Sequence, residues 1–549
     1  MKKYYFLLCA LSVALVACDI ENGEQPTDDP QGLPEWYYAG GELGTAFLAT
    51  SNALEQPAPS VENGHWMESF KNGEAIFEKQ FMSNISGTRG GLGPVYVRAS
   101  CLHCHPGYSH GESVEAGKYN TEAVGNGTLL VIYDPATEAY KTWAAGMPQL
   151  HAVEPFKAPI DPSQITIEWK VATACAASGD KMAFADGETF ELRYPEVYLP
   201  KEAIYGYEQL NLGDYKVKLE NTIGIYGTGL LDAIPEDSLI AQWALEEEAY
   251  QAGHLKHWNS AMFEGGVYKN YYSNSRQGDG TKYVRRYTYA MSRGPLLDAA
   301  GANAIWNITN VTRSDRRYHY LDLAGTNYAT ISSKDPEVQA GFPAYIAKVD
   351  PNKEHPEWWT DNVEQNIYNY LTSTSLPVEM TDDEYADLMV WHRGLAVPAV
   401  RNIHDEKVQK GKDLFTQIGC ATCHRPSWTT GPDYIQDPNK FFTRNNDMPR
   451  FPYQKIWPYT DMVQHKLCME NDIRTGWCRT TPLWGRGLHQ KCTGDAYEAR
   501  LHDTRARNVV EAIMWHGYSS ESDAIESTTN FYNLPKADRD AIVAFINAI

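Results

Sequence analysis

Beyond its first 17 residues, the sequence lacks any apolar run long enough to cross a lipid bilayer. It also lacks an excess of positive charge, because 48 Lys and Arg stand against 70 Asp and Glu and leave a net charge of -22. A chain this acidic repels the phosphate backbone of nucleic acids, so we expect no nucleic-acid partner. The same charge suits a basic redox partner protein, and 549 residues with 43% apolar side chains provide for two or three globular domains.

The N-terminus has the pattern of an export signal. Two lysines precede an apolar stretch at residues 4–17, and Leu-Val-Ala-Cys at residues 15–18 has the pattern of a bacterial lipobox. We therefore predict a lipoprotein signal peptide at residues 1–17 and a lipid on Cys18. An ordinary secretory signal that ends in cysteine is the alternative.

Residues 18–33 are predicted to be an acidic tether between the lipid and the folded protein. Positions 19–33 hold five acidic residues, two prolines and no basic residue, too little apolar surface for a core. We expect the protein to be exported to the periplasmic or cell-surface side, where the lipid anchors it to a membrane.

The sequence contains two copies of a Cys-x-x-Cys-His motif, and these are its main indication of function. The first contains Cys101, Cys104 and His105, and the second contains Cys420, Cys423 and His424. This spacing is typical of haem c attachment, since two thiols reach the porphyrin vinyl groups and the histidine reaches the iron from the same turn. A zinc knuckle or a thioredoxin-like pair would not explain why histidine follows the second cysteine both times. We predict two covalently bound haem c groups, with one iron ligated by each histidine.

Four cysteines remain after the signal, the lipid and the haem motifs, and these are Cys175, Cys468, Cys478 and Cys492. In an oxidising compartment they would tend to form disulfides, and four thiols allow three connectivities that the sequence does not distinguish. We favour a Cys478–Cys492 bridge, which would close a short loop. A zinc site is the alternative, although these cysteines include no close Cys-x-x-Cys pair.

Each haem motif follows a segment in which glycine stands four residues before phenylalanine. The pairs are Gly73 with Phe77 and Gly411 with Phe415. In the first helix of a cytochrome c domain, such a glycine lets a closing helix cross closely, and the aromatic ring packs against it. The C-terminal helix is expected to close the second domain through apolar residues at helical spacing: Ile542, Phe545, Ile546 and Ile549.

The first haem domain is expected to close only after a long insertion. Thr381 and Glu384 form a capping box that starts the closing helix, and Pro398 stops it. Inside the insertion, residues 165–169 and 189–194 alternate like strands around an Asp-Gly turn.

We therefore predict a mainly α protein with two cytochrome c-like haem domains. The N-terminal domain covers residues 34–397 and is interrupted by an insertion, at about residues 126–380, that carries a small β element. The C-terminal haem domain covers residues 398–549.

Several further segments occur in a characteristic order: Gly-Leu-Gly-Pro at 91–94, Gly-Thr-Gly-Leu-Leu-Asp-Ala-Ile-Pro-Glu at 227–236, Leu-Ala-Val-Pro at 395–398, Thr-Pro-Leu-Trp-Gly at 481–485 and Leu-His-Asp-Thr-Arg-Ala at 501–506. With the two haem motifs, these segments resemble the bacterial di-haem oxidoreductase family, whose members are named as peroxidases or thiol oxidoreductases. That family is similar to di-haem cytochrome c peroxidases and to the di-haem enzyme that matures methylamine dehydrogenase.

The resemblance implies roles for individual residues. In the related peroxidases, the sixth ligand of the C-terminal haem lies fourteen residues after the histidine of a His-Asp-Gly motif, and counting from His502 gives His516. Hydrogen peroxide or a related oxidant would react at the open iron of the His105 haem. A distal carboxylate would act there as acid and base, and the candidates are Glu236 and Asp232.

Two further inferences concern the haems. Bis-histidine ligation would make the second haem a low-potential electron-transfer or storage site. His103 and His110 lie near the first motif and could cap its iron instead. Relatives also hold calcium between the haems, although the sequence presents no carboxylate cage for it.

The sequence leaves competing functions. We favour the interpretation that the protein is a peroxidase-like enzyme, which takes electrons from a redox partner protein or a small electron donor. The first alternative is a non-enzymatic electron-transfer cytochrome in which both irons have two protein ligands, and the second is a haem-bearing interaction lipoprotein. Whether the first iron has a protein sixth ligand distinguishes the enzyme from the carrier.

Overall fold

The computed structural model describes residues 32–83, 90–114, 117–118, 127–144, 146–273, 280–298, 305–321, 326–442 and 447–549. The predicted signal peptide, Cys18 and all but the last two residues of the tether lie outside the described residues. The fold is mostly helical, with 35% helix, 12% strand and small sheets, which confirms the prediction of a mainly α chain. Within the described ranges, every helix is too short or too polar to cross a membrane.

The first haem motif is preceded by a helix that crosses the predicted closing helix at a glycine. Helix α4 (Met67–Glu78) packs against α11 (Asp382–Arg393), which begins at the capping box of Thr381 and Glu384. A Cβ atom on Gly73 would lie only 2.5 Å from Cβ of Trp391, so only glycine permits this approach.

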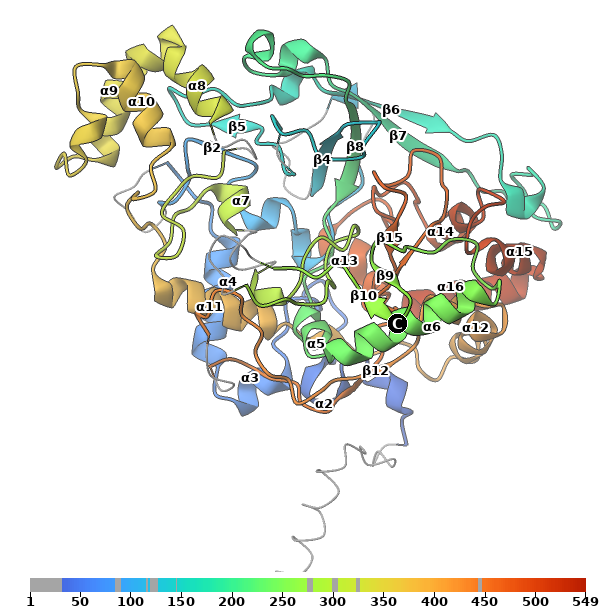
Figure 1. The fold of residues 1–549 in the computed structure, drawn as a ribbon. Helices are drawn as coiled ribbons and strands as arrows, with labels where there is room; N and C mark the ends of the chain where they lie inside the picture. The colour runs from blue at the N-terminus through green and yellow to red at the C-terminus, as the bar shows by residue number, and fades with distance from the viewer. Residues whose placement is uncertain are drawn as a thin grey trace, which may run out of the picture.

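The second haem motif is preceded by the same arrangement. Helix α12 (Glu406–Gln417) packs against α16 (Lys536–Ala548), and a Cβ atom on Gly411 would collide with the Ala541 carbonyl group. Figure 1 shows the two helix pairs apart, with α4 and α11 at the left and α12 and α16 at the right. Both predicted glycine crossings are confirmed.

The residues between α4 and α11 include small sheets and a helical group at the top of Figure 1. Strand β4 (Thr128–Tyr133) pairs antiparallel with β8 (Lys216–Asn221), and β6 (Thr166–Val171) pairs with β7 (Arg193–Tyr198) and β3 (Gly117–Lys118). Helices α8 (Asn327–Lys334), α9 (Pro336–Val349) and α10 (Val363–Leu371) form the helical group.

Three hydrophobic cores hold these parts together. The largest lies under both helix pairs and also contains apolar residues of α5 (Thr228–Asp232) and α6 (Glu236–Gln251). A second core lies among α8, α9 and α10, and a third lies between the β4–β8 and β6–β7 pairs. Part of the predicted insertion therefore belongs to the main core.

The remaining α-helices are short or C-terminal: α2 (Gly41–Gly44), α3 (Pro59–Asn63), α7 (Ile305–Thr309), α13 (His489–Thr493), α14 (Val509–His516) and α15 (Ile525–Asn533). The remaining strand pairs have two residues per strand: β1 (Thr45–Ala46) with β11 (Val397–Pro398), β2 (Val95–Tyr96) with β5 (His151–Ala152), β9 (Phe263–Glu264) with β10 (Val267–Tyr268), β12 (Trp428–Thr429) with β13 (Lys455–Ile456), and β14 (Gln464–His465) with β15 (Cys478–Arg479).

Two local predictions were wrong. The second strand of the insertion runs over Arg193–Tyr198 rather than residues 189–194, because Phe190 and Leu192 are buried in the main core instead of pairing with β6. The Cys478–Cys492 bridge does not form, and all cysteines among the described residues are unpaired. The Cys492 sulfur lies 3.9 Å from the Thr50 carbonyl oxygen, whereas Cys478 lies in β15.

The glycine crossing in the C-terminal pair can be tested by a single methyl group. Gly411→Ala should lower the free energy of unfolding by about 1–3 kcal/mol, because the α12–α16 approach leaves no room for Cβ. Chemical denaturation measures the change. Gly146→Ala is the matched control, since the nearest atom to its new Cβ would be 3.9 Å away; equal stability of both variants would contradict the crossing.

Candidate functional site

A cavity of about 580 Å³ surrounds the first Cys-x-x-Cys-His motif. Cys101, Cys104 and His105 all line it, so the two thiols and the imidazole reach one enclosed space. Cofactor pockets commonly have volumes of about 300–1,000 Å³. The residues of the motif and the size of the cavity therefore fit a bound haem c.

The wall of this cavity comes from distant parts of the chain. Phe77 of α4 and Trp391 of α11 form part of it, with their ring centres 4.3 Å apart. Leu129 of β4 and Glu220 of β8 form another part, and residues 287–296 complete it. The insertion thus supplies much of the wall around the first motif.

Two histidines face this cavity, His105 half-buried and His392 buried. Burial lowers the pKa of His105 to about 4 and that of His392 to about 3, so both imidazoles are neutral near pH 7. Nδ1 of His105 and Nε2 of His392 have no hydrogen-bond partner within the described ranges. Neutral imidazoles with free nitrogen atoms are suitable metal ligands.

Glu220 is the only carboxylate among the described residues that line the cavity. It lies opposite Leu129 in the β4–β8 pair, and its side chain makes no hydrogen bond or ion pair with a described residue. Burial raises the pKa of Glu220 to about 7, although Arg474 and Lys218 lower it in part. A carboxylate with this pKa can both accept and donate a proton near neutrality.

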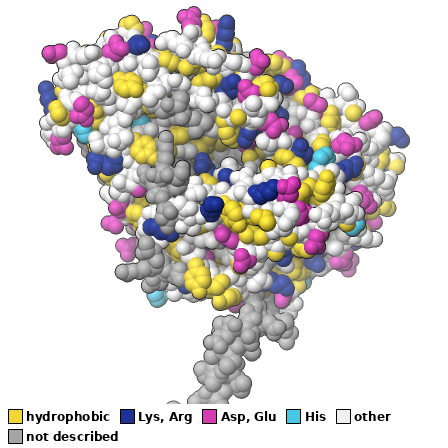
Figure 2. Space-filling view, in the orientation of Figure 1, with side chains coloured by type: hydrophobic (Ala, Val, Ile, Leu, Met, Phe, Trp, Pro, Cys, Tyr) yellow, Lys and Arg dark blue, Asp and Glu magenta, His cyan; other side chains and the backbone are white. Residues whose placement is uncertain are grey.

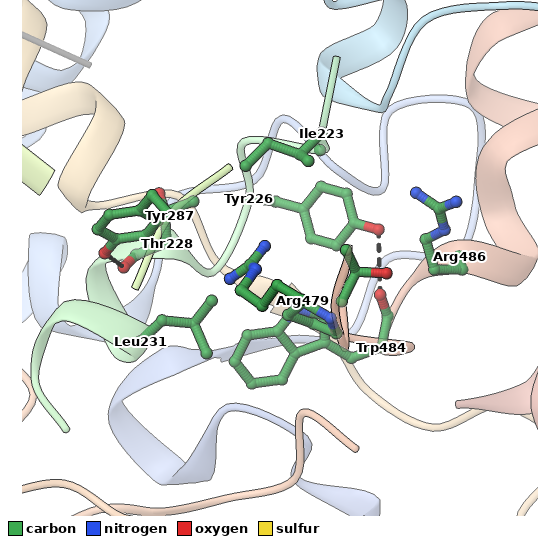
Figure 3. A pocket seen from close by; sticks show the side chains of 11 residues that line it. Ile223, Tyr226, Thr228, Leu231, Tyr287, Arg479, Trp484 and Arg486 are labelled. Atoms are coloured by element: carbon green, nitrogen blue, oxygen red, sulfur yellow. Dashed lines mark hydrogen bonds between the residues drawn. The ribbon is translucent and has the colours of Figure 1, made fainter. Parts of the chain in front are cut away.

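A second cavity of about 30 Å³ adjoins the first (Figure 3). The two cavities share a group of lining residues: Ile223, Gly224, Thr228 and Tyr287. The far wall of the small cavity includes Trp484 and two arginines, Arg479 and Arg486. It therefore connects the surroundings of the first motif with the C-terminal part of the chain.

His516 lies opposite His424 at the second motif. Their ring centres are 6.4 Å apart, and the ring planes are inclined by 49°. Nδ1 of His424 donates to the Tyr459 carbonyl at 3.0 Å, and Nδ1 of His516 donates to the Ala512 carbonyl at 2.7 Å.

This arrangement fits two axial ligands of one metal ion. A carbonyl oxygen only accepts, so the protons are on Nδ1 and the lone pairs are on the Nε2 atoms. Two imidazoles bound to one metal at about 2.0 Å each have ring centres about 6 Å apart. The separation of His424 and His516 is close to this value, and the pairing of the two residues as ligands, which the family resemblance implies, stays a prediction.

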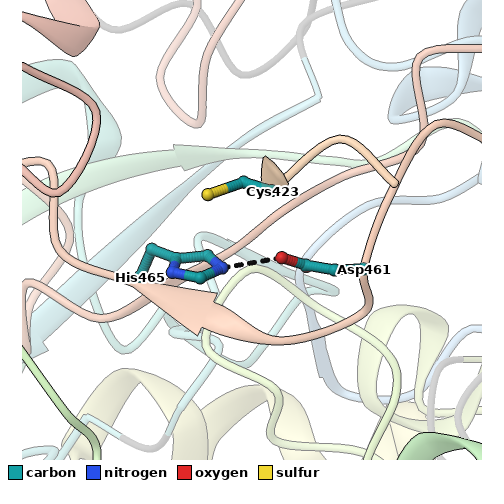
Figure 4. A group of neighbouring side chains, drawn as sticks. All are labelled: Cys423, Asp461 and His465. Atoms are coloured by element: carbon teal, nitrogen blue, oxygen red, sulfur yellow. Dashed lines mark hydrogen bonds and ion pairs between the residues drawn. The ribbon is translucent and has the colours of Figure 1, made fainter. Parts of the chain in front are cut away.

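Cys423, Asp461 and His465 form a compact group beside the second motif (Figure 4). Their potential ligand atoms lie within 4.8 Å of one another, and Nε2 of His465 is 2.7 Å from Oδ2 of Asp461. A metal ion at this place would need the Cys423 thiolate. A thioether bond from Cys423 to haem removes that thiolate, so the two uses of this sulfur exclude each other.

The predicted acid-base residues do not face the large cavity, whose described lining includes neither Asp232 nor Glu236. Asp232 is buried and forms an ion pair with Arg393, with Nη1 and Oδ2 2.9 Å apart. Glu236 starts α6 and accepts a hydrogen bond from the Val284 amide at 2.8 Å. These contacts give both carboxylates structural partners.

His103 and His110 are also absent from the described lining of the cavity. His110 is buried, and its ring stacks on His489 with 3.7 Å between the ring centres. Ser109 Oγ lies 2.9 Å from Nδ1 of His489. This contact places His110 in the packing beside the motif.

Sequence reasoning did not single out Glu220 or His392. His392 could have been found, because it follows Leu388 by four positions on the closing helix and therefore shares the buried face. Glu220 offered no signal, since a glutamate in a strand such as Lys-Val-Lys-Leu-Glu-Asn is usually exposed to solvent.

Residues 371–549 match the family model described as "Di-haem oxidoreductase, putative peroxidase". The match includes the second Cys-x-x-Cys-His motif, His516, both closing helices and the residues that partner Cys423. The family predicted from the sequence motifs is thereby confirmed for this C-terminal region. No curated protein and no solved structure matches the chain.

The structural role of Asp232 can be separated from a catalytic one. Asp232→Asn should lower the free energy of unfolding by about 3 kcal/mol, because it removes one partner of the buried Arg393 guanidinium. Denaturation of the purified variant measures this loss. Asp237→Asn, at an exposed position on the next helix, is the control. Unchanged stability with lost turnover would instead make Asp232 a reacting group.

Proposed function

We propose, from the membership of residues 371–549 in the di-haem oxidoreductase family, that the chain is a di-haem c-type oxidoreductase with peroxidase-like activity. The observation that carries the proposal is the 580 Å³ cavity that Cys101, Cys104 and His105 face together. A haem in this cavity would be enclosed on several sides yet have room for a small oxidant. Two cytochrome c-like domains, residues 34–397 and 398–549, would each carry one haem.

The two haems would have different roles. When bound, each haem supplies a redox-active iron, and the first would also react with hydrogen peroxide or a related oxidant. His424 and His516 would hold the second iron from both sides, which suits electron transfer or storage. His105 would hold the first iron from one side.

Glu220 would move the proton that peroxide chemistry needs. Its carboxylate has no partner among the described residues and lines the same cavity as His105. It would take a proton from one oxygen atom of a bound peroxide and deliver it to the other oxygen atom. The second oxygen atom would then leave as water. We therefore assign the acid-base role to Glu220 and not to Glu236 or Asp232. Glu236 contacts Val284, and Asp232 contacts Arg393.

One observation favours a second function, a non-enzymatic electron carrier. His392 faces the cavity of the first motif with a free Nε2 atom. If it held the first iron as a sixth ligand, no position would remain for peroxide. The spin state of the first haem distinguishes the two functions.

Electrons would reach the haems from a redox partner protein or a small donor, and the net charge of -22 suits a basic partner. The lipid on Cys18 would hold the protein to a membrane on the periplasmic or cell-surface side.

The ligands of the second haem can be tested by spectroscopy. The oxidised protein should show one high-spin and one low-spin ferric haem by electron paramagnetic resonance. His516→Ala should convert the low-spin centre, because it removes one of its two imidazoles, whereas the exposed His404→Ala should not. Two low-spin haems, one of them converted by His392→Ala, would support the carrier and contradict the peroxidase.

The proton role of Glu220 predicts a pH dependence. Only the ionised carboxylate accepts a proton, so peroxide turnover should rise as the pH passes through about 7, the raised pKa of Glu220. Glu220→Gln should lower turnover by about 10²–10⁴-fold and abolish this rise. Glu236→Gln is the matched variant outside the cavity, and the reverse result would return the role to Glu236.

A further inference from the structure

The small cavity beside the large one contains two buried guanidinium groups. Arg479 is 2% exposed and Arg486 is 9% exposed, and both line the cavity. In Figure 3 the ring of Tyr226 is drawn between the two guanidinium groups. Among the described lining residues there is no Asp or Glu, so the cavity wall is positively charged.

These two arginines lack a carboxylate partner. The Arg486 side chain makes no hydrogen bond or ion pair with a described residue. Arg479 donates from Nη1 to the Arg286 carbonyl at 2.7 Å, but its Nε has no partner in the described ranges. Burying an unpaired cation costs free energy, so we expect an anion from outside the chain to lie beside these two guanidinium groups.

Other buried arginines of the protein do have such partners. Four of them pair with Asp or Glu: Arg393 with Asp232, Arg505 with Asp503, Arg539 with Glu188, and Arg313 with Asp315. Carboxylates therefore balance these four buried guanidinium groups, whereas no described carboxylate forms an ion pair with Arg486. The absence of a counter-charge at Arg486 is a property of the cavity.

The polar hydroxyl groups around the cavity do not provide the missing charge. Tyr226 donates to the Trp484 carbonyl at 3.0 Å, and Tyr287 donates to the Thr228 carbonyl at 2.9 Å. Neither phenol is a carboxylate, and burial raises the pKa of Tyr226 to about 12, which keeps it neutral. A neutral phenol cannot balance a guanidinium.

The size of the cavity limits the anion to a single small group. Its volume of about 30 Å³ exceeds the roughly 10–15 Å³ that one water molecule needs and leaves room for one small group. The rest of the anionic molecule must lie elsewhere. The adjoining 580 Å³ cavity, which shares four lining residues with the small one, can hold it.

We infer that the small cavity binds a carboxylate group of the porphyrin attached at Cys101 and Cys104, with Arg486 and Arg479 as its cationic partners. This inference rests on the proposed function. Arginine binds carboxylates through strong charge-assisted hydrogen bonds. A free carboxylate or another small oxyanion would offer the same chemistry, so the experiment must distinguish the two sources.

The positive charge of Arg486 should stabilise the reduced iron relative to the oxidised iron, which carries one more positive charge. Arg486→Gln should therefore lower the midpoint potential of the high-spin haem and leave that of the low-spin haem in place. Arg486→Lys, which keeps the charge, should retain most of the wild-type potential. Arg317→Gln, at an exposed arginine of the insertion, is the control for the loss of one positive charge.

Spectroelectrochemical titration of the full-length holoprotein measures both potentials. A second arm titrates the wild-type protein with sodium formate. An unchanged spectrum with formate, together with the lower potential of Arg486→Gln, supports a porphyrin carboxylate in the cavity. Formate can also bind to an open ferric iron, so the same titration is made on Arg486→Gln. A saturable spectral change that the wild-type protein shows and Arg486→Gln lacks would reveal a free-anion site at the arginines and overturn the inference, whereas an equal change in both proteins comes from formate on the iron and counts as no binding at the arginines.

The inference is also overturned if Arg486→Gln and Arg486→Lys shift the potential equally, or if only the potential of the low-spin haem changes. A pyridine haemochrome assay on the same samples counts the haems. Two haems per chain and an unchanged potential in Arg486→Gln would contradict the inference and leave the proposed function standing. Fewer than two haems per chain would contradict the proposed function itself.

Discussion

The contact between each first helix and its closing helix is the constraint on which both haem motifs depend. At Gly73 and at Gly411 the helices approach so closely that a methyl group would meet the opposite helix. The phenylalanine one turn later then lies beside the histidine of its motif. The ring centres of Phe77 and His105 are 6.4 Å apart, and those of Phe415 and His424 are 6.1 Å apart. Two segments separated by more than 300 residues thus share the same close helix crossing at glycine and the same contact between phenylalanine and histidine.

The buried charges of the protein divide into two groups. Arg393 and Arg505 are held by aspartates within the core. The Arg393–Asp232 ion pair joins segments about 160 positions apart, whereas Arg505 pairs with Asp503 in its own turn. Glu220 and Arg486 face cavities, and neither forms a hydrogen bond or ion pair through its side chain with a described residue, although Arg474 and Lys218 lower the pKa of Glu220 in part. Since an unpaired buried charge is costly, groups of the second kind mark places where a ligand or a moving proton is expected. The two carboxylates first proposed as catalytic, Asp232 and Glu236, have protein partners.

The insertion does more than extend the first domain. Its strands β4 and β8 and its residues 287–296 line the cavity around His105, and α5 and α6 enter the main core. The chemistry near the first motif is therefore set largely by residues far from it in sequence. Near the second motif, His516 lies within the matched C-terminal region, on α14, about 90 residues after His424.

The sequence by itself determined the features that depend on local spacing. The Cys-x-x-Cys-His motifs, the capping box at Thr381 and the glycine-phenylalanine pairs all depend on residues a few positions apart, where helix geometry dictates what can meet. His516 was predicted only through the family resemblance, by counting fourteen positions from His502. Only the tertiary structure decided which carboxylate faces the first cavity and which guanidinium groups lack partners. Those outcomes depend on contacts between residues such as Glu220 and Leu129, or Asp232 and Arg393, that lie about 90 to 160 positions apart. Whether a buried charge is paired is a property of the whole packed chain, because the partner is supplied by folding and not by sequence neighbours.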